Sequence, residues 1–391
     1  MFVKITPMSS LRLNNATAVV GDELLESVSV SIVDQQISAI HSASAESGDA
    51  IDCAGLTLLP GFIDVHIHGA KGIDVNSADG DGLFEIAKFL ASHGVTGWLP
   101  TLVPDSDSNY AHAISAIDRL MEMQLDEPVA QAVGVHYEGV FANEKMCGAL
   151  RPEFFKRFVE HELTELPRLK NGVHMTTFAP EIEGGIALAK ELKRQGWIAS
   201  IGHTKADLDT LNQAIQAGAN HLTHFYNAMT GMHHRDIGVV GWAFSNPEVT
   251  FDIIADAIHV HPAMLEFACR TKGPNKVSLI SDSIAATGLG DGQFQIWGEN
   301  VSVKDGRTRN ERGSIAGSVI TMLDAVKRML SIGFSSAEVS RMASLNPAKL
   351  LGLHDELGSL ALGQRADLVA LDEGGTVRLT VVGGRVAFDG R

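Results

Sequence analysis

The sequence predicts an α/β protein, a (β/α)8 TIM-like barrel with a small β-sandwich domain formed from both chain ends. Three observations lead to this prediction. Short apolar segments alternate with helix-like ones through the middle of the 391-residue chain, and segments of alternating apolar and polar residues stand at each end. The composition, with 45% hydrophobic and 20% charged residues, is ordinary for a globular protein.

Both ends of the chain are β-like. The first end, between about Leu11 and Leu59, contains ATAVV, SVSVSIV, QQISAI and TLLP, and the second contains ADLVALD, VRLTVV and GRVAFDG. Polar or Gly-containing turns separate these segments, and no long helical period appears in the first end. We therefore expect one small domain from residues 1–58 and 360–391.

The middle of the chain, residues 59–359, repeats a strand-then-helix order. Such an order predicts a parallel sheet with crossover helices, and about eight strands fit a closed barrel better than an open doubly wound sheet. The strand-like segments are PGFIDV, TGWLPTL, AVGVHYEG, GVHMTTFAPE, GWIASIGHT, NHLTHFYNA, VTFDIIADAIHV and VSLISDSI, and the helix-like ones include GLFEIAKFLASHG, GIALAKELKRQG and TMLDAVKRML.

Charge and cysteine content narrow the possible partners. The formal net charge of −16 opposes nucleic-acid binding, although a few placed cations in a cleft can still hold an anionic small molecule. The three cysteines, Cys53, Cys147 and Cys269, lack paired spacing and suit reduced thiols in the cytoplasm. Because the first residues lack an apolar signal-peptide core and no run approaches the ~18 apolar residues that cross a bilayer, we expect no membrane association.

Two histidines follow the first barrel strand. In PGFIDVHIHG, His66 and His68 stand two residues apart, so both side chains point to the same face at the strand's carboxyl end. Barrel enzymes present metal ions at this end. A His-x-His pair is a weak signal by itself, because two histidines also occur together on half-exposed strands.

Four more candidate ligands end later strands. Each has an ordinary structural explanation, such as a helix cap, a salt-bridged carboxylate or a satisfied core histidine. Their recurrence at one end of successive strands favours a divalent metal site, which imidazole and carboxylate suit and which acidifies bound water. Asp282, without an evident cationic neighbour in sequence, suits a proton shuttle. These residues are Glu138, His203, His224 and Asp282.

The sequence resembles the amidohydrolase superfamily and, within it, the N-acetylglucosamine-6-phosphate deacetylase family. Matching blocks occur in order through most of the chain: PGFIDVHIHG, HGVTGWLPTL, VHYEGVFAN, FAPE, SIGHT, THFYNAM, GVVG, IADAIHVHP, SDSIAATG, AGSVITM and GSLALGQRADLVALD. The resemblance implies a homodimer, metal held by Glu138, His203 and His224, and Asp282 as general base and then acid. No lysine occurs in VHMTTFAPE, so Glu138 would replace a bridging carboxylated lysine.

The resemblance also implies a sugar-phosphate pocket, some of it contributed across the dimer. One departure concerns the hexosamine, because Leu150 stands where many members place a histidine that touches the sugar. A guanidinium and an imidazole are suitable partners for a phosphate dianion. The implied substrate-binding residues are Asn227, Ala228, Arg235, His259, Ala149, Leu150, Ile315, Ala316 and Gly317.

The expected reaction is hydrolysis of the acetamide of N-acetylglucosamine-6-phosphate. Zn²⁺ is the expected cofactor, with Fe²⁺, Co²⁺ or Mn²⁺ as alternatives, and the retention of His66 and His68 allows a second ion. His136 is expected to pack behind the site or to help stabilise the oxyanion. Three alternatives stay open: an N-acetylgalactosamine-6-phosphate deacetylase, an amidohydrolase acting on a non-phosphorylated amide, and a metal-loaded barrel that only binds a ligand.

Overall fold

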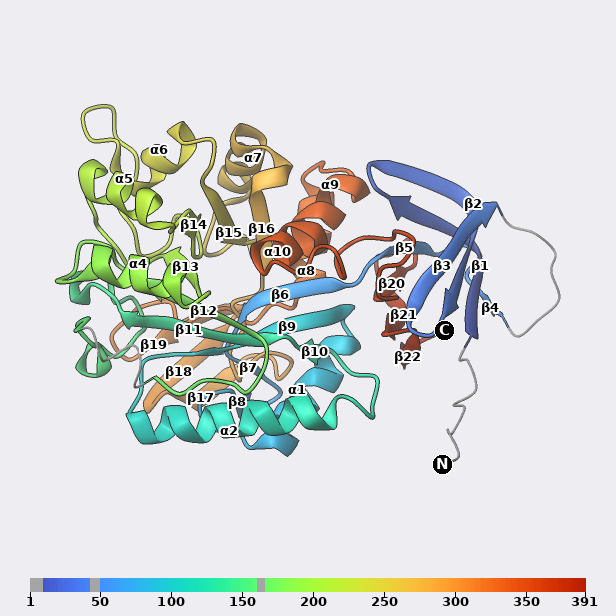
Figure 1. The fold of residues 1–391 in the computed structure, drawn as a ribbon, viewed down its shortest axis with the longest axis horizontal. Helices are drawn as coiled ribbons and strands as arrows, with labels where there is room; N and C mark the ends of the chain where they lie inside the picture. The colour runs from blue at the N-terminus through green and yellow to red at the C-terminus, as the bar shows by residue number, and fades with distance from the viewer. Residues whose placement is uncertain (1–9, 43–49, 160–165) are drawn as a thin grey trace.

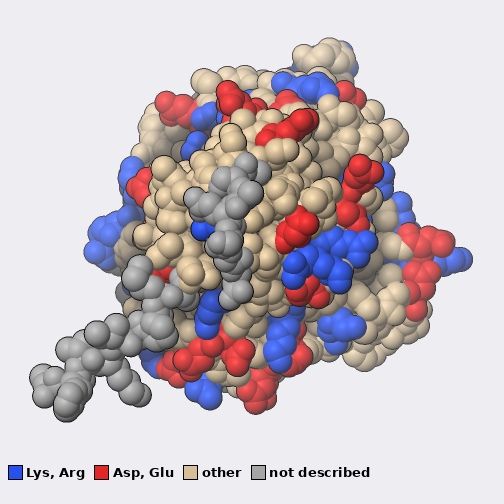
Figure 2. All heavy atoms as spheres, turned by 90° about the vertical axis from the view of Figure 1, so that its right-hand side faces the viewer, with Lys and Arg blue, Asp and Glu red and all other residues tan. Residues whose placement is uncertain are grey.

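A computed structural model of the chain describes residues 10–42, 50–159 and 166–391, so the prediction that concerns residues 1–9 lies outside the described part. A barrel of parallel strands and a separate sheet lie side by side (Figure 1). Lys, Arg, Asp and Glu side chains alternate over the face on the side of the separate sheet (Figure 2). Among the described residues, no helix combines the length and hydropathy that a bilayer-crossing segment requires.

The separate sheet draws its eight strands from both ends of the chain, as the sequence predicts. Its central strand β5 pairs in parallel with β1 and antiparallel with β20, so the first and last segments of the chain meet there. Its strands are β1 (Ser10–Val20), β2 (Glu23–Val33), β3 (Gln36–Ser42), β4 (Ile51–Asp52), β5 (Thr57–Pro60), β20 (Leu368–Leu371), β21 (Val377–Val382) and β22 (Arg385–Asp389).

The barrel contains all eight predicted strands in parallel. A bridge between Ile67 and Ser283 joins the first strand to the last and completes the ring. The strands are β6 (Phe62–Ile67), β9 (Val95–Leu102), β11 (Gly134–Phe141), β12 (Val173–Phe178), β13 (Ile198–Ile201), β14 (His221–Leu222), β15 (Thr250–Ile254) and β16 (Val277–Ile280), with the short β10 (Gln131–Ala132) beside β9.

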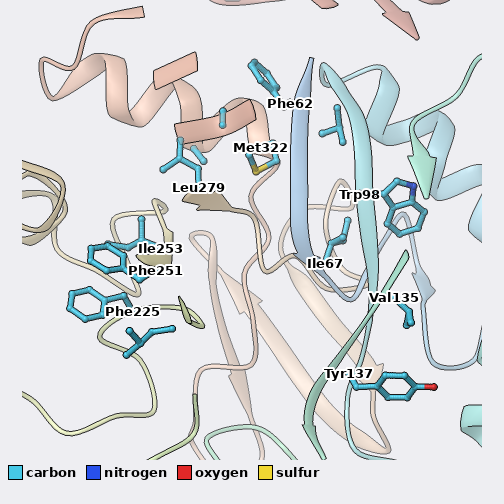
Figure 3. Packing of buried hydrophobic residues seen from close by; sticks show 14 of the residues in the cluster. Phe62, Ile67, Trp98, Val135, Tyr137, Phe225, Phe251, Ile253, Leu279 and Met322 are labelled. Carbon is cyan, nitrogen blue, oxygen red and sulfur yellow. The ribbon is translucent and has the colours of Figure 1, made fainter. Parts of the chain in front are cut away.

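Helices cover the outside of the barrel. Buried side chains such as Phe62, Trp98 and Phe251 fill the layer that packs with them (Figure 3). Polar caps start several helices: the Asp79 carboxylate accepts from an N–H of α1, and Thr321 forms a capping box at α8. The helices are α1 (Gly80–Ala91), α2 (Asp107–Met123), α4 (Gly185–Arg194), α5 (Leu208–Ala217), α6 (Gly238–Ser245), α7 (Pro262–Lys272), α8 (Met322–Ser331), α9 (Ser336–Ser340) and α10 (Asn346–Leu350).

Smaller elements complete the fold. After β16 the chain forms an antiparallel three-stranded sheet that was not predicted from the sequence. The small strands are β7 (Gly69–Ala70), β8 (Ile73–Asp74), β17 (Gly292–Ile296), β18 (Glu299–Lys304) and β19 (Arg307–Asn310), and the short helical turns are η1 (Glu144–Met146), η2 (Pro152–Phe154), η3 (Pro274–Lys276) and η4 (Arg341–Leu345).

The predicted domain boundaries can be placed on these elements. The boundary between residues 58 and 59 falls inside β5, and the boundary between residues 359 and 360 precedes β20. The division into domains at these positions stays a prediction.

Candidate active site and metal centre

The first and last strands of the barrel bring His66, His68 and Asp282 together. The backbone N–H of Asp282 donates to the carbonyl of His66 at 2.9 Å, and that of His68 donates to the carbonyl of Ser283 at 2.8 Å. These hydrogen bonds align the carboxyl end of β6 with the residues that follow β16. The two imidazole Nε2 atoms lie 3.0 Å apart, so His66 and His68 face one point.

Three site residues stand two positions beyond the end of a strand, in left-handed backbone. His203 follows β13, His224 follows β14 and Asp282 follows β16, with φ values of 48°, 35° and 50°. Residues other than glycine seldom adopt this region, and where it persists the surrounding structure enforces it, often at functional sites. Asp252 supports one of these turns by accepting a hydrogen bond from the backbone N–H of His224.

Glu138 meets two of these histidines through one oxygen. Its Oε1 lies 3.0 Å from Nε2 of His203 and 3.0 Å from Nε2 of His224, and the two Nε2 atoms are 3.1 Å apart. All three residues are buried and form one of the two groups in the described chain that can hold a metal ion. The three predicted ligands are therefore assembled by the fold.

The other oxygen of Glu138 faces the second group. Its Oε2 lies 3.2 Å from Nε2 of His68 and 3.6 Å from Nε2 of His66. Oδ1 of Asp282 lies 3.3 Å from Nε2 of His68 and 3.5 Å from Nε2 of His66. Glu138 thus stands between two ligand groups, the second made of His66, His68 and Asp282.

The two carboxylates set the electrostatics of the site. Burial opposes charge on Glu138, but the surrounding imidazoles hold its pKa well below its usual range. Burial likewise opposes charge on the imidazoles, yet hydrogen bonds to Asp282 and Glu138 raise the pKa of His68 to about 10, and Glu138 raises that of His224 to about 9. The site therefore favours positive charge between its carboxylates.

The ligand geometry fits a divalent cation. Nδ1 of His203 lies 2.8 Å from the carbonyl of Met146, and Nδ1 of His68 lies 3.1 Å from the carbonyl of Thr101. A carbonyl only accepts, so each Nδ1 donates its proton there, which leaves Nε2 of each ring as the nitrogen that can ligate an ion. In a tetrahedral zinc site, ligand atoms about 2.0–2.1 Å from the ion stand about 3.3 Å apart, close to the separations above.

A cavity of about 290 Å³ opens over this centre. His259 lines it, and Nδ1 of His259 lies 2.6 Å from Oδ2 of Asp256, which orients the ring. Leu150 is buried and also lines the cavity. The predicted residues that line the cavity are His68, Glu138, Ala149, Leu150, His203, His224, Asn227, Ala228, His259, Asp282, Ile315 and Gly317.

Three predicted residues do not line this cavity. His66 is fully buried behind it, with its Nε2 still directed at the carboxylates. Arg235 is exposed, and its guanidinium donates to His234 at 2.6 Å. Ala316 is fully buried, and its N–H donates to Thr308 Oγ1 at 3.1 Å. Within this single chain, neither Arg235 nor Ala316 reaches the cavity where the substrate was expected.

His136 lies behind the site. One ring nitrogen lies 3.1 Å from the carbonyl of Val65 and the other lies 2.7 Å from Oγ1 of Thr177. Burial, with the nearby His66 charge, lowers the pKa of His136 well below its usual value, so the ring is neutral. The packing role expected for His136 fits these contacts, whereas neither nitrogen is left for an oxyanion.

Several residues of the site were not predicted from the sequence. Trp297, in the turn between β17 and β18, lines the cavity, and its ring meets that of His68 edge to face with centroids 5.2 Å apart. The sheet that carries Trp297 could have been predicted in part, because Asp305 begins an Asp-Gly turn between two alternating segments, which is a hairpin signal. The role of Asp252 had no such signal, because only the fold places it beneath His224. Gly148, Ile254 and Ser314 also line the cavity.

Comparison with known proteins identifies the family. A model of the amidohydrolase family matches residues 57–387. The chain belongs to this family. It is 37% identical to N-acetylgalactosamine-6-phosphate deacetylase of Escherichia coli O157:H7, over 84% of this chain and 87% of the relative, and 34% identical to N-acetylglucosamine-6-phosphate deacetylase of Bacillus subtilis, over 97% of both.

Solved structures give the same assignment. N-acetylglucosamine-6-phosphate deacetylase of Pasteurella multocida superposes with a TM-score of 0.89 at 28% identity, over 97% of this chain and 99% of that one. The enzyme of Thermotoga maritima gives a TM-score of 0.85 at 32% identity, with the same shares covered. The resemblance found in the sequence is therefore confirmed, and the chain is a deacetylase-type enzyme of the amidohydrolase family.

Proposed function

We propose that this chain hydrolyses the acetamide of N-acetylglucosamine-6-phosphate, releasing acetate and glucosamine-6-phosphate. The observation that supports this most directly is the position of Glu138 between two buried ligand groups, the second of which combines Asp282 with His66 and His68. Relatives that carry the name of this activity match almost the whole length of the chain.

The cofactor that we propose is Zn²⁺, at Glu138, His203 and His224, with a second ion at His66, His68 and Asp282. Imidazole and carboxylate ligands also accept Fe²⁺, Co²⁺ or Mn²⁺. When bound, such an ion polarises an amide carbonyl and lowers the pKa of water beside it. Glu138, with one oxygen directed at each group, can serve both ions.

Asp282 transfers the proton between the attacking water and the leaving amine. Asp282, 7% exposed, has a pKa below its usual value: burial raises it, but the charge of His66 and the hydrogen bond to His68 outweigh burial. It is therefore ionised and accepts a proton as water attacks the acetamide carbon. As the tetrahedral carbon collapses and the C–N bond breaks, Asp282 returns the proton to the leaving amine nitrogen. Acetate and the free amino sugar leave.

Leu150 bears on which hexosamine phosphate is preferred. It lines the cavity as a buried apolar side chain and offers no hydrogen bond to a sugar hydroxyl. Together with the 37% identity to an N-acetylgalactosamine-6-phosphate deacetylase, this favours the galacto substrate as the second candidate. An amidohydrolase without a phosphate requirement is the remaining alternative.

We include a homodimer in the proposal, because the substrate phosphate needs a cation that a second copy of the chain can supply. No Lys or Arg is found among the residues that line the cavity in the described chain, yet a phosphate dianion calls for a cation. Arg235 stands exposed on the loop before α6, where it is available to a second copy. In a homodimer we expect Arg235→Ala to raise KM for phosphorylated substrates far more than it lowers kcat.

We also propose a cytoplasmic location and no nucleic-acid or membrane partner. Cys53, Cys147 and Cys269 are all free thiols, two of them buried, which suits a reducing compartment. The net charge of −16 disfavours polyanions.

The test is an acetate-release assay on protein of measured metal content. Its panel contains N-acetylglucosamine-6-phosphate, N-acetylgalactosamine-6-phosphate and N-acetylglucosamine without phosphate. The proposal expects the highest kcat/KM on the first, weak activity without phosphate, and loss of activity on chelation that Zn²⁺ restores. Highest kcat/KM on the galacto substrate would replace the first candidate by the second, and equal activity without phosphate would reject both.

A further inference from the structure

A second cavity, of about 620 Å³, lies at the opposite end of the barrel from the metal centre. Ile198, His221 and Thr250, the first residues of β13, β14 and β15, line it, as does Ser278 near the start of β16. The metal ligands stand in the carboxyl halves of the strands or beyond their ends, so the body of the barrel separates the two cavities. The lining of the second cavity suits a ligand that the catalytic reaction does not require.

The charged side chains that line this second cavity are all cationic. They are Lys193, Lys276, Arg341 and Lys349, and the lining contains no Asp or Glu. Arg341 is neutralised by Asp22 and donates to Asn275. The three lysines have no carboxylate partner in the described part of the chain. In a protein with a net charge of −16, this is a local excess of positive charge.

The positive charge of Lys276 also affects the pKa of a nearby lysine, Lys272. Burial, and after it the charge of Lys276, lower the pKa of Lys272 to about 8. Lys276 thus adds positive charge at this end of the barrel, where the cavity lining contains no carboxylate. A bound anion would compensate it, and phosphate groups suit clusters of lysine and arginine.

A buried acceptor lies among these cations. Asn346 lines the cavity and is 7% exposed. Its Nδ2 donates to the carbonyls of Pro274 and Val277, both at 2.6 Å, which fixes the orientation of the amide. Its Oδ1 has no hydrogen-bond partner. Because a buried acceptor without a partner costs free energy, the cavity calls for a ligand group that donates a hydrogen bond.

We propose that this cavity binds a small phosphate monoester that carries hydroxyl groups, at a site separate from the catalytic cavity. The phosphate interacts with Lys193, Lys276 and Lys349, and a hydroxyl donates to Oδ1 of Asn346. The volume is within the range of small-molecule sites and accommodates a hexose phosphate. The proposal does not depend on which substrate the catalytic centre prefers.

The test uses glucose 6-phosphate, which has no acetamide to hydrolyse, and isothermal titration of the metal-loaded protein. The variant is Lys193→Glu with Lys349→Glu, both exposed in the structure and remote from the catalytic residues. Its matched control, Lys170→Glu with Lys190→Glu, changes the net charge equally at exposed positions that do not line the cavity. We expect the affinity of the cavity variant for glucose 6-phosphate at this site to fall by at least about tenfold. In the titration, the cavity variant should therefore bind one equivalent per chain fewer than the wild type.

Other outcomes overturn the proposal. The same number of equivalents bound by the wild type and the cavity variant, or an equal loss in the control, would mean that no specific site exists here. Catalytic kcat and KM, measured in parallel, should not change in either variant, which separates this site from the catalytic one. Methyl phosphate, without hydroxyls, should bind this site about tenfold or more weaker, and equal affinity would remove the role of Asn346.

Discussion

Asp252 accepts a hydrogen bond from the backbone N–H of His224 through one carboxylate oxygen and lies 3.2 Å from the ring of His221 through the other. It is fully buried in β15. Because His224 adopts left-handed backbone at φ 35°, this contact helps to keep its imidazole directed at Glu138. Asp252 is thus a positioning residue for the metal centre.

Replacement of Asp252 by Asn should weaken metal binding. The amide cannot accept from both neighbours as the carboxylate does, so the turn at His224 loses part of its support. We expect affinity for the ion at Glu138, His203 and His224 to fall about 10–100-fold, as is usual when groups that orient ligands are changed. Competition with a chelator of known affinity measures this, and wild-type affinity in a folded variant would contradict it.

Replacement of Asp282 by Asn should separate catalysis from metal binding at Glu138, His203 and His224. The amide cannot take up the proton of the attacking water, so kcat should fall by about 100-fold or more. Metal at the group of Glu138, His203 and His224 should be retained, since Asp282 contacts only the other group. Elemental analysis and acetate release on the same sample check both points. Turnover like that of the wild type would eliminate the proton-transfer role.

Replacement of Gly139 by Ala should destabilise the active-site strand. Gly139 follows Glu138 at φ +69°, and an added Cβ would lie 2.2 Å from Cδ1 of Leu150. Left-handed strain and overpacking together should lower the free energy of unfolding by about 2–4 kcal/mol. Gly21→Ala is the control, because Gly21 has φ +61° with nothing within 4 Å of the added atom. That control should lose about 1 kcal/mol in chemical denaturation, and equal losses would show that Leu150 imposes no constraint.

The pair of Asp256 and His259 should give stability that depends on pH. Burial raises the pKa of Asp256, but the hydrogen bond and charge of His259 and two backbone N–H groups outweigh it, so the pKa lies below 3.8. A carboxyl with a lowered folded pKa contributes stability above its unfolded value, and this contribution disappears as the pH falls through the folded value. The difference in unfolding free energy between wild type and Asp256→Asn should therefore narrow below pH 3.8. A difference that stays constant from pH 5 to pH 2 would contradict this assignment.

The sequence was sufficient to predict the barrel because each strand is a short apolar segment followed by a helix. For the same reason it placed Glu138, His203 and His224 at one end, since ligands at the carboxyl ends of neighbouring parallel strands must converge. The bridging position of Glu138 could not be predicted, because it depends on the rotation of one carboxylate between four imidazoles.

What was missed arises from contacts distant in sequence. The turn carrying Trp297 reaches His68 only because the insertion after β16 folds back over the cavity. Arg235 and Ala316 were placed in the pocket by resemblance, and in this chain they lie outside it. The left-handed backbone at Asp282 could not be predicted, because the sequence there offers no glycine and Asp adopts this region only more often than other non-glycine residues do.

The pairing of β5 with both β1 and β20 has a consequence for biosynthesis. A ribosome makes β1 to β5 more than three hundred residues before β20 emerges. Until then β5 presents an unpaired edge, and such edges invite association with other chains. The barrel, whose strands are made in order, can form while the nascent chain is still growing. The strands β20 to β22, translated more than three hundred residues after β5, therefore determine when the earliest strands become protected.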